Sequence, residues 1–361
     1  MKSLRSSLLM LGWLSLSLGC QPEETLLAPG SGLETRGESL SDLVGSWSTT
    51  ASSGGPFQVA TLMRGTGDVL TQYCGIAYVY NPYTDTWRSS GMMSSLSRCA
   101  YTLTELPSGK VLAAGGDIGP KYSASRTELY DPATSTWSTL PSTLSSPRYR
   151  HTATLLDSGQ VLLVGGYGYR EQRTIQGTEL YTPETDTWSI AGSTLIPRSS
   201  HTATLLYSGK VLVAGGEASS LESHASAELY DPATNTWTLT ASMARARKYH
   251  LAVRLYSGYV MVLGGAHPTE TSVEMFDPYN ERWFAGPTLP FSGPYSATML
   301  FSGEVLVTGS SGRAAVYDPS TNTWLPAATM NQIRGAAVPV LLHTGQVQVF
   351  GPNGLSERFT R

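Results

Sequence analysis

Short apolar runs alternate with turn residues along most of this chain, in a repeating order. One unit opens with His201-Thr-Ala-Thr-Leu-Leu, turns at Ser208-Gly209 and continues with Val211-Leu-Val-Ala-Gly-Gly. A variable loop then leads to Ala227-Glu-Leu-Tyr-Asp-Pro and to Asn235-Thr-Trp-Thr-Leu-Thr. Apolar runs of about four to eight residues bounded by turn signals are typical of strands rather than helices. Each unit therefore predicts four short strands, which we call a, b, c and d in chain order.

Three markers repeat in the same register. The turn between strands a and b is a Ser/Thr-Gly pair, a hairpin signal, and it occurs seven times: at Thr66, Ser108, Ser158, Ser208, Ser257, Ser302 and Thr344. Seven tryptophans, Trp13 aside, mark strand d: Trp47, Trp87, Trp137, Trp188, Trp237, Trp283 and Trp324. All but Trp47 follow a Tyr/Phe-x-Pro element. A glycine doublet closes strand b at Gly115, Gly165, Gly215 and Gly264, whereas Gly309 and Gly351 keep only its first glycine.

The double glycine, with a Tyr and a Trp set apart in the second half of each unit, resembles the kelch repeat over residues 45–361. The resemblance implies an all-β fold, a seven-bladed β-propeller with four strands per blade around a channel. The strand count agrees, because four short strands per period of roughly 40–50 residues is typical of propellers.

The two ends of the repeat region complement each other. Leu355-Ser-Glu-Arg-Phe-Thr matches strand c, and the chain then ends without a strand d. Gly45-Ser-Trp-Ser-Thr-Thr matches a strand d that lacks the other three. Pairing the two segments would remove two exposed sheet edges. We therefore expect the last blade to take three strands from the C-terminal end and one from the N-terminal end.

The first residues predict export. Lys2 and Arg5 precede an apolar core from Leu8 to Leu18, which predicts a signal peptide over residues 1–19. The residues before Cys20 resemble a bacterial lipobox, which implies acylation of that cysteine, but they also satisfy ordinary secretory cleavage. Residues 20–44 are polar and turn-rich, as a tether would be. We expect an outer-membrane or cell-surface lipoprotein, or a secreted protein, whose only membrane contact is this lipid anchor.

Charge narrows the classes of partner. Charged residues make up 14% of the chain, the net charge is −3, and no run of lysine or arginine occurs. This balance lacks the electrostatic footprint of a nucleic-acid-binding protein. We expect a monomer that binds no nucleic acid.

Five blades share an arginine before strand a and a glutamate two residues before the strand-c aromatic. The arginines are Arg98, Arg148, Arg198, Arg247 and Arg334, and the glutamates are Glu128, Glu179, Glu228, Glu274 and Glu357. The other two blades lack both, with Pro56 and Tyr78 in one and Ser292 and Ala315 in the other. Because presence and absence coincide, we favour structural Arg–Glu pairs over a guanidinium ring that binds an anionic ligand.

Three histidines, His151, His201 and His250, open strand a in consecutive blades, near the expected channel mouth. Three imidazoles could suggest zinc or copper. No carboxylate or cysteine recurs beside them, so we favour hydrogen bonds to loops near the channel and expect no metal.

Two cysteines and two tyrosines leave alternatives open. Cys74 ends strand b of the first blade and Cys99 begins strand a of the second, so a disulfide and two separate thiols are both consistent with the sequence. Cys99 with Tyr149 is also similar to the crosslinked pair of kelch-type copper-radical oxidases, and Tyr249-His250 is similar to their ligand pair. The C-terminal domain that completes their copper site has no counterpart in this sequence.

The loops between strands b and c vary most, and propeller function usually lies in such loops. Tyrosine and arginine are enriched at binding centres, which makes six residues ligand-binding candidates: Tyr122, Tyr167, Tyr169, Arg170, Arg173 and His224. We expect a binding or scaffold protein for a protein or glycan, with no catalytic residue and no cofactor. The alternative is a copper-radical oxidase-like enzyme, with copper on the propeller axis.

Overall fold

A computed structural model describes residues 43–361 except 54, 56, 95–97, 120–121, 266–268, 334–336 and 352–353, and only the backbone of Tyr295. The predicted signal peptide, Cys20 and nearly all of the predicted tether therefore lie outside the described residues. Val44, the last residue of that predicted tether, already donates its backbone N–H to the carbonyl of Pro326, 2.9 Å away.

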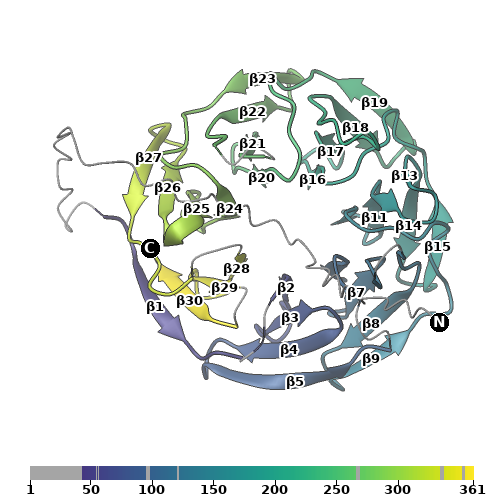
Figure 1. Ribbon diagram of the computed structural model, residues 1–361, viewed down its shortest axis with the longest axis horizontal. Helices are drawn as coiled ribbons and strands as arrows, with labels where there is room; N and C mark the ends of the chain where they lie inside the picture. Colours follow the sequence, from purple (N-terminus) through teal and green to yellow (C-terminus); the bar gives the residue numbers. More distant parts are fainter. Residues whose placement is uncertain are drawn as a thin grey trace, which may run out of the picture. The chain divides into compact units, whose positions relative to one another are not determined.

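Seven antiparallel four-stranded sheets form the blades of the ring (Figure 1). Blades 1 and 2 are β2–β5 and β6–β9, blade 3 is β10, β11, β14 and β15, and blades 4 to 6 are β16–β19, β20–β23 and β24–β27. Blade 7 consists of β28–β30 and β1. This is the predicted seven-bladed propeller.

The first strand of each blade lies nearest the axis (Figure 1) and contacts the first strands of both neighbouring blades, so the ring is closed. These inner strands are β2 (Val59–Leu62), β6 (Thr102–Glu105), β10 (Thr152–Leu155), β16 (Thr202–Leu205), β20 (Leu251–Arg254), β24 (Pro294–Met299) and β28 (Val338–Leu341).

The second strands are β3 (Val69–Tyr73), β7 (Val111–Ala114), β11 (Val161–Val164), β17 (Val211–Ala214), β21 (Val260–Leu263), β25 (Val305–Gly309) and β29 (Val347–Phe350). Almost every residue in them is buried. They are mostly apolar because neighbouring blades cover both faces of each sheet, and their few polar residues, such as Gln72 and Gln348, are buried as well.

The third strands are β4 (Ile76–Asn81), β8 (Thr127–Asp131), β14 (Thr178–Thr182), β18 (Ala227–Asp231), β22 (Val273–Asp277), β26 (Ala314–Asp318) and β30 (Ser356–Thr360). The outer strands are β5 (Thr86–Met92), β9 (Thr136–Thr139), β15 (Thr187–Ile190), β19 (Thr236–Thr240), β23 (Arg282–Ala285), β27 (Thr323–Ala327) and β1 (Ser46–Thr50). A short hairpin of β12 (Tyr167–Gly168) and β13 (Arg173–Thr174) lies in one loop, and the 3-10 turn η2 (Ser310–Gly312) joins β25 to β26.

Strand β1 closes the last blade, as the orphan segments predicted. It pairs antiparallel with β30, with Trp47 opposite Phe359. The two rings lie 5.1 Å apart at their centroids, as do Phe276 and Trp283 of blade 5. The N-terminal tryptophan therefore occupies the same structural position as the tryptophan of an uninterrupted blade. Figure 1 shows β1 beside β30, at opposite ends of the colour scale.

The strand order gives the ring two distinct faces. The loops between the second and third strands lie with the blade-to-blade connections on one side, which we call the loop face. The Ser/Thr-Gly turns lie with the turns that join the third and fourth strands on the other side, which we call the turn face.

Candidate functional site

The shared arginines and glutamates form ion pairs inside single blades. Arg148 lies 2.6 Å from Glu179, Arg198 lies 2.7 Å from Glu228 and Arg247 lies 3.1 Å from Glu274. Arg98 and Glu128 approach to 3.6 Å, and all eight side chains are buried. Arg334 lies outside the described residues, while its expected partner Glu357 accepts backbone N–H groups from residues 331–333.

The same arginines organise the loop face. Arg148 also donates to the carbonyls of Gly165 and Gly177, at the two ends of the loop that holds β12 and β13. Burial lowers the pKa of Arg198, and Glu228 opposes that shift. These guanidinium groups are buried and already have partners. They therefore hold the ends of the loops in place rather than forming an open ring that binds anions.

The three histidines connect neighbouring blades, which differs from the predicted contacts with loops at the channel mouth. Each ring is buried, and its Nε2 lies within hydrogen-bond distance of a threonine on the preceding inner strand: Thr102 for His151, Thr152 for His201 and Thr202 for His250. Burial, reinforced by Arg148, lowers the pKa of His151 to about 3. The rings are therefore neutral at physiological pH.

The first glycines of three doublets, Gly115, Gly165 and Gly215, make room for these rings, whereas Gly264 faces Pro294. A Cβ on Gly115 would lie 2.6 Å from Cε1 of His151, and one on Gly215 would lie 2.7 Å from Cε1 of His250. Both glycines have positive φ, which larger residues adopt only with strain. The histidine of one blade thus packs against the glycine doublet of the preceding blade.

Three tyrosines form an interlocked cluster on the loop face of blade 3. Tyr149 stacks on Tyr169, with centroids 4.6 Å apart and ring planes 15° apart. Tyr167 meets both rings edge-on, at 5.8 and 5.9 Å. Burial and a hydrogen bond with Tyr169 raise the pKa of Tyr149. The sequence identified Tyr167 and Tyr169 as ligand-binding candidates, and the structure adds Tyr149 as their packing partner.

A buried carboxylate extends this cluster into the next blades. Glu217 is buried and accepts from Lys248 at 2.7 Å, from the Tyr249 hydroxyl at 3.1 Å and from Arg150 at 3.4 Å. The Arg150 guanidinium lies over the rings of both Tyr149 and Tyr249, 5.3 and 5.2 Å from their centroids. Tyrosine rings, two cations and one carboxylate thus form a continuous, partly buried polar and aromatic network on the loop face of blades 3 to 5.

Sequence reasoning missed Arg150, Glu217 and Lys248. Their positions follow a rule that the repeat alignment contains. Arg150 and Lys248 each lie between the shared arginine and the histidine, and Glu217 directly follows a glycine doublet. The backbone brings these positions together, because Ser199 and Glu217 form an antiparallel bridge. Variable residues between fixed repeat positions are therefore the signal that could have revealed them.

A residue with left-handed backbone recurs in the blade-to-blade connections of this network. Arg150, Ser200 and Tyr249 occupy equivalent positions in blades 3 to 5, and each has φ of 55° or 56°. The Ser200 N–H donates to the carbonyl of Arg150, and the Tyr249 N–H donates to that of Ser200. Ala100, the equivalent residue of blade 2, has φ of 51°, so this left-handed conformation belongs to the repeat and fixes where these side chains start.

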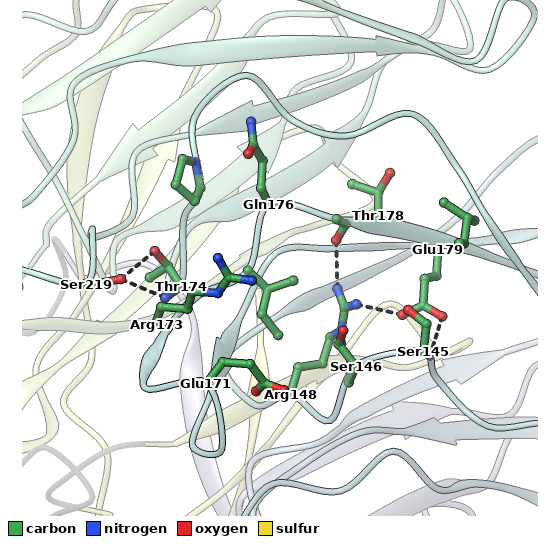
Figure 2. Close-up of a pocket in the computed structure, with 14 residues that line it drawn as sticks. Ser145, Ser146, Arg148, Glu171, Arg173, Thr174, Gln176, Thr178, Glu179 and Ser219 are labelled. Atoms are coloured by element: carbon green, nitrogen blue, oxygen red, sulfur yellow. Dashed lines mark hydrogen bonds and ion pairs between the residues drawn. The ribbon is translucent and has the colours of Figure 1, made fainter.

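A pocket of about 410 Å³ is lined in part by Arg173 and Thr174 of β13 (Figure 2). The Arg148–Glu179 pair lies at one end, and Ser219 accepts the Thr174 N–H at the other. Arg173 lines this pocket and is exposed, as is the neighbouring Arg170.

The remaining two candidates lie on the same face. Tyr122 is exposed, so its ring is free to contact a ligand. His224 is half-buried, and burial and Arg198 lower its pKa.

Cys74 and Cys99 form a disulfide that joins blade 1 to the start of blade 2. The crosslink between Cys99 and Tyr149 that the oxidase resemblance implied is therefore wrong for this structure, since the sulfur of Cys99 is already bonded. Nε2 of His250 is already within hydrogen-bond distance of Thr202. Over the described part of the chain, no three His, Cys, Asp or Glu side chains form a group that could hold a metal ion. These residues do not fit a copper-radical site.

Within the described ranges, no helix is long and apolar enough to cross a membrane.

Comparisons with known proteins agree with the fold. Residues 100–307 match the family model of the KLHDC2/KLHL20/DRC7 kelch-repeats domain. A solved fungal alcohol oxidase of the AA5 family, in complex with copper, is similar with a TM-score of 0.71 and 15% identity, covering 88% of this chain and 76% of that chain. At that identity the likeness concerns the fold alone. No relative was found among curated proteins. Since the family match spans more than half of the chain, this protein belongs to the kelch-repeat family.

Proposed function

We propose that this chain is an exported binding or scaffold protein that recognises a protein or a glycan through its loop face. The observation that carries the proposal is the cluster of Tyr149, Tyr167 and Tyr169 beside Arg150. Tyrosine and arginine supply much of the binding energy at protein interfaces. Ring stacking and the ion pair with Glu217 already restrict these side chains, so binding would cost little further rotamer entropy.

Two features support export. A disulfide such as Cys74–Cys99 persists mainly in oxidising compartments outside the cytosol. The charged and apolar pattern before Cys20 has the form of a signal peptide. We propose that Cys20 is acylated and that residues 20–44 tether the propeller to the outer membrane or cell surface. Mass analysis of the mature N-terminus distinguishes this anchored form from a secreted one.

The test of binding compares the wild type with a loop-face variant, Tyr169→Ala/Arg170→Ala/Arg173→Ala. Wild-type protein is used to capture ligands from a glycan array and from extracted cell-surface proteins. Each captured ligand is then purified, and its affinity is measured by calorimetry. We expect the triple variant to bind at least tenfold more weakly.

The matched control is Leu239→Ala, which alters an exposed apolar side chain on the outer strand β19. This variant should retain the wild-type affinity. Equal affinity of the triple variant and the wild type, or the absence of any purified ligand that binds the wild type, would contradict the proposal.

A further inference from the structure

Exposed aromatic rings form an arc on the turn face, opposite the cluster described above. Tyr207, Tyr256 and Phe301 each precede the Ser-Gly turn of blades 4, 5 and 6, and they are 56%, 59% and 58% exposed. The equivalent residues of the other four blades are Gly65, Pro107, Asp157 and His343. The Arg254 guanidinium lies over one face of Tyr207, 4.1 Å from its centroid. Large exposed rings at one repeat position in consecutive blades are a feature of the kind that marks interaction sites.

The rings of Tyr256 and Phe301 pack against the turn glycine of the next blade. A Cβ on Gly303 would lie 3.2 Å from the ring of Tyr256, and one on Gly345 would lie 3.2 Å from the ring of Phe301. Each ring thus extends from its own blade across the turn glycine of the following blade. One edge of each ring is covered in this way, while much of its surface faces solvent.

A pocket of about 400 Å³ lies beside Tyr256, between blades 5 and 6. Its polar lining includes Ser257, Glu304, Asp318 and Ser320. The pocket therefore combines one aromatic ring with carboxylates and hydroxyls, the arrangement of a small-ligand site in which a few polar groups fix orientation.

Blade 6 departs from the repeat at this pocket. In blades 2 and 4 the residue after the turn glycine is a lysine paired with the aspartate that ends the third strand, as in Lys210–Asp231 at 3.6 Å. In blade 6 these positions hold Glu304 and Asp318. Glu304 binds the Arg361 guanidinium through both of its oxygens, at 2.6 and 2.8 Å. Asp318 thus lacks the lysine partner that its equivalents have, and its Oδ1 accepts from Ser320.

We propose that this site binds an oligosaccharide. A sugar ring presents a face of C–H groups, which the negative face of an aromatic ring attracts, and Tyr256 supplies such a face. Asp318 and the Ser257 hydroxyl would bond the hydroxyls at the ring edge. Because Arg361 occupies both oxygens of Glu304, Asp318 is the carboxylate that remains to accept from the ligand. An oligosaccharide fits the arc better than a single sugar, because aromatic rings recur from blade to blade. Phe301 also lines a pocket of about 600 Å³ among the inner strands, where further sugars could lie.

The test measures binding of soluble cello-, xylo-, chito-, malto- and galacto-oligosaccharides of four to six sugars to the purified protein. We expect one class to bind the wild type. Tyr256→Ala should weaken that binding at least tenfold, while Tyr256→Phe should retain most of it because the ring remains. Asp318→Asn should weaken binding through loss of the charged acceptor.

Tyr83→Ala is the matched control, since it removes an exposed tyrosine from the turn between β4 and β5 of blade 1. It should not change saccharide affinity, and neither should the loop-face triple variant. The proposal is overturned if no member of the set binds the wild type at 10 mM sugar. It is also overturned if Tyr256→Ala binds as the wild type does, or if the loop-face variant alone abolishes binding.

Discussion

The buried ion pair of blade 4 offers a sharp test of the argument that the shared arginines and glutamates are structural. Glu228 accepts the Arg198 guanidinium at 2.7 Å and the backbone N–H groups of Leu195 and Ile196 at 2.6 and 3.1 Å. Neither charged side chain is exposed. Glu228→Gln keeps the shape of the side chain, removes its charge and replaces one acceptor oxygen with a donor.

The expected cost follows from what remains around Arg198. Removing one partner of a buried pair typically costs about 3–5 kcal/mol, because the other charge stays buried without compensation. Arg198 keeps the carbonyl oxygens of Gly215 and Ser226, at 2.6 and 3.1 Å, and these partly solvate its charge. We therefore expect Glu228→Gln to lower the free energy of unfolding by about 3 kcal/mol, toward the lower end of that range.

A double-mutant cycle separates this effect from simple loss of packing. Arg198→Met/Glu228→Gln removes both charges, so its cost should fall short of the summed single costs by about 2 kcal/mol. Urea denaturation followed by tryptophan fluorescence gives each value. Blade 6 already carries such a joint replacement, with Ser292 and Ala315 at the two positions. Additivity within about 0.5 kcal/mol would refute the reasoning, because it would mean that the two charges do not stabilise each other.

Three further predictions follow from the contacts between blades. The pKa of His201 is well below its usual value, so the unfolded state binds a proton that the folded state does not. Stability should therefore fall by about 1 kcal/mol per histidine over the first pH unit below 6.5. His201→Gln should make urea midpoints measured from pH 7.5 to 5.5 less pH-dependent, and an unchanged dependence would contradict this. The 25-residue separation of Cys74 and Cys99 predicts that Cys74→Ser/Cys99→Ser lowers the free energy of unfolding by about 3.5 kcal/mol, a loss that reductant should reproduce in the wild type and leave unchanged in the variant. Trp47→Ala should lower the free energy of unfolding about as much as Trp283→Ala does, by about 3 kcal/mol, as measured by thermal unfolding. If only Trp283→Ala lowered it, β1 would not contribute to closure of the ring.

The repeat made most of the fold predictable from sequence, because each marker corresponds to a local requirement. Glycine at the hairpin turn, the apolar second strand and the Tyr–Trp pair are needed in each blade whatever its neighbours are. The role of His201 was not predictable in this way, since its partner Thr152 belongs to the preceding blade. Contacts between repeats depend on the angle between blades, which strand spacing alone does not fix.

The loop-face cluster was only partly predictable for a related reason. Tyr167 and Tyr169 stand out because they lie in a long variable loop. Glu217 does not, because a glutamate after a glycine doublet resembles an ordinary solvated residue. Its importance appears only when Arg150 and Lys248 converge on it from two different blades.

The pairing of β1 with β30 also has a consequence for biogenesis. Thr50 and Ser356 touch although they lie 306 residues apart along the chain, and so large a separation makes their encounter a slow and late event. Because synthesis proceeds from the N-terminus, β1 leaves the ribosome first and β30 leaves it last. Intermediates that hold only the first six blades expose unpaired strand edges, which invite aggregation or proteolysis. Because the ring closes only when β1 pairs with β30, a truncated or stalled chain cannot form the closed ring.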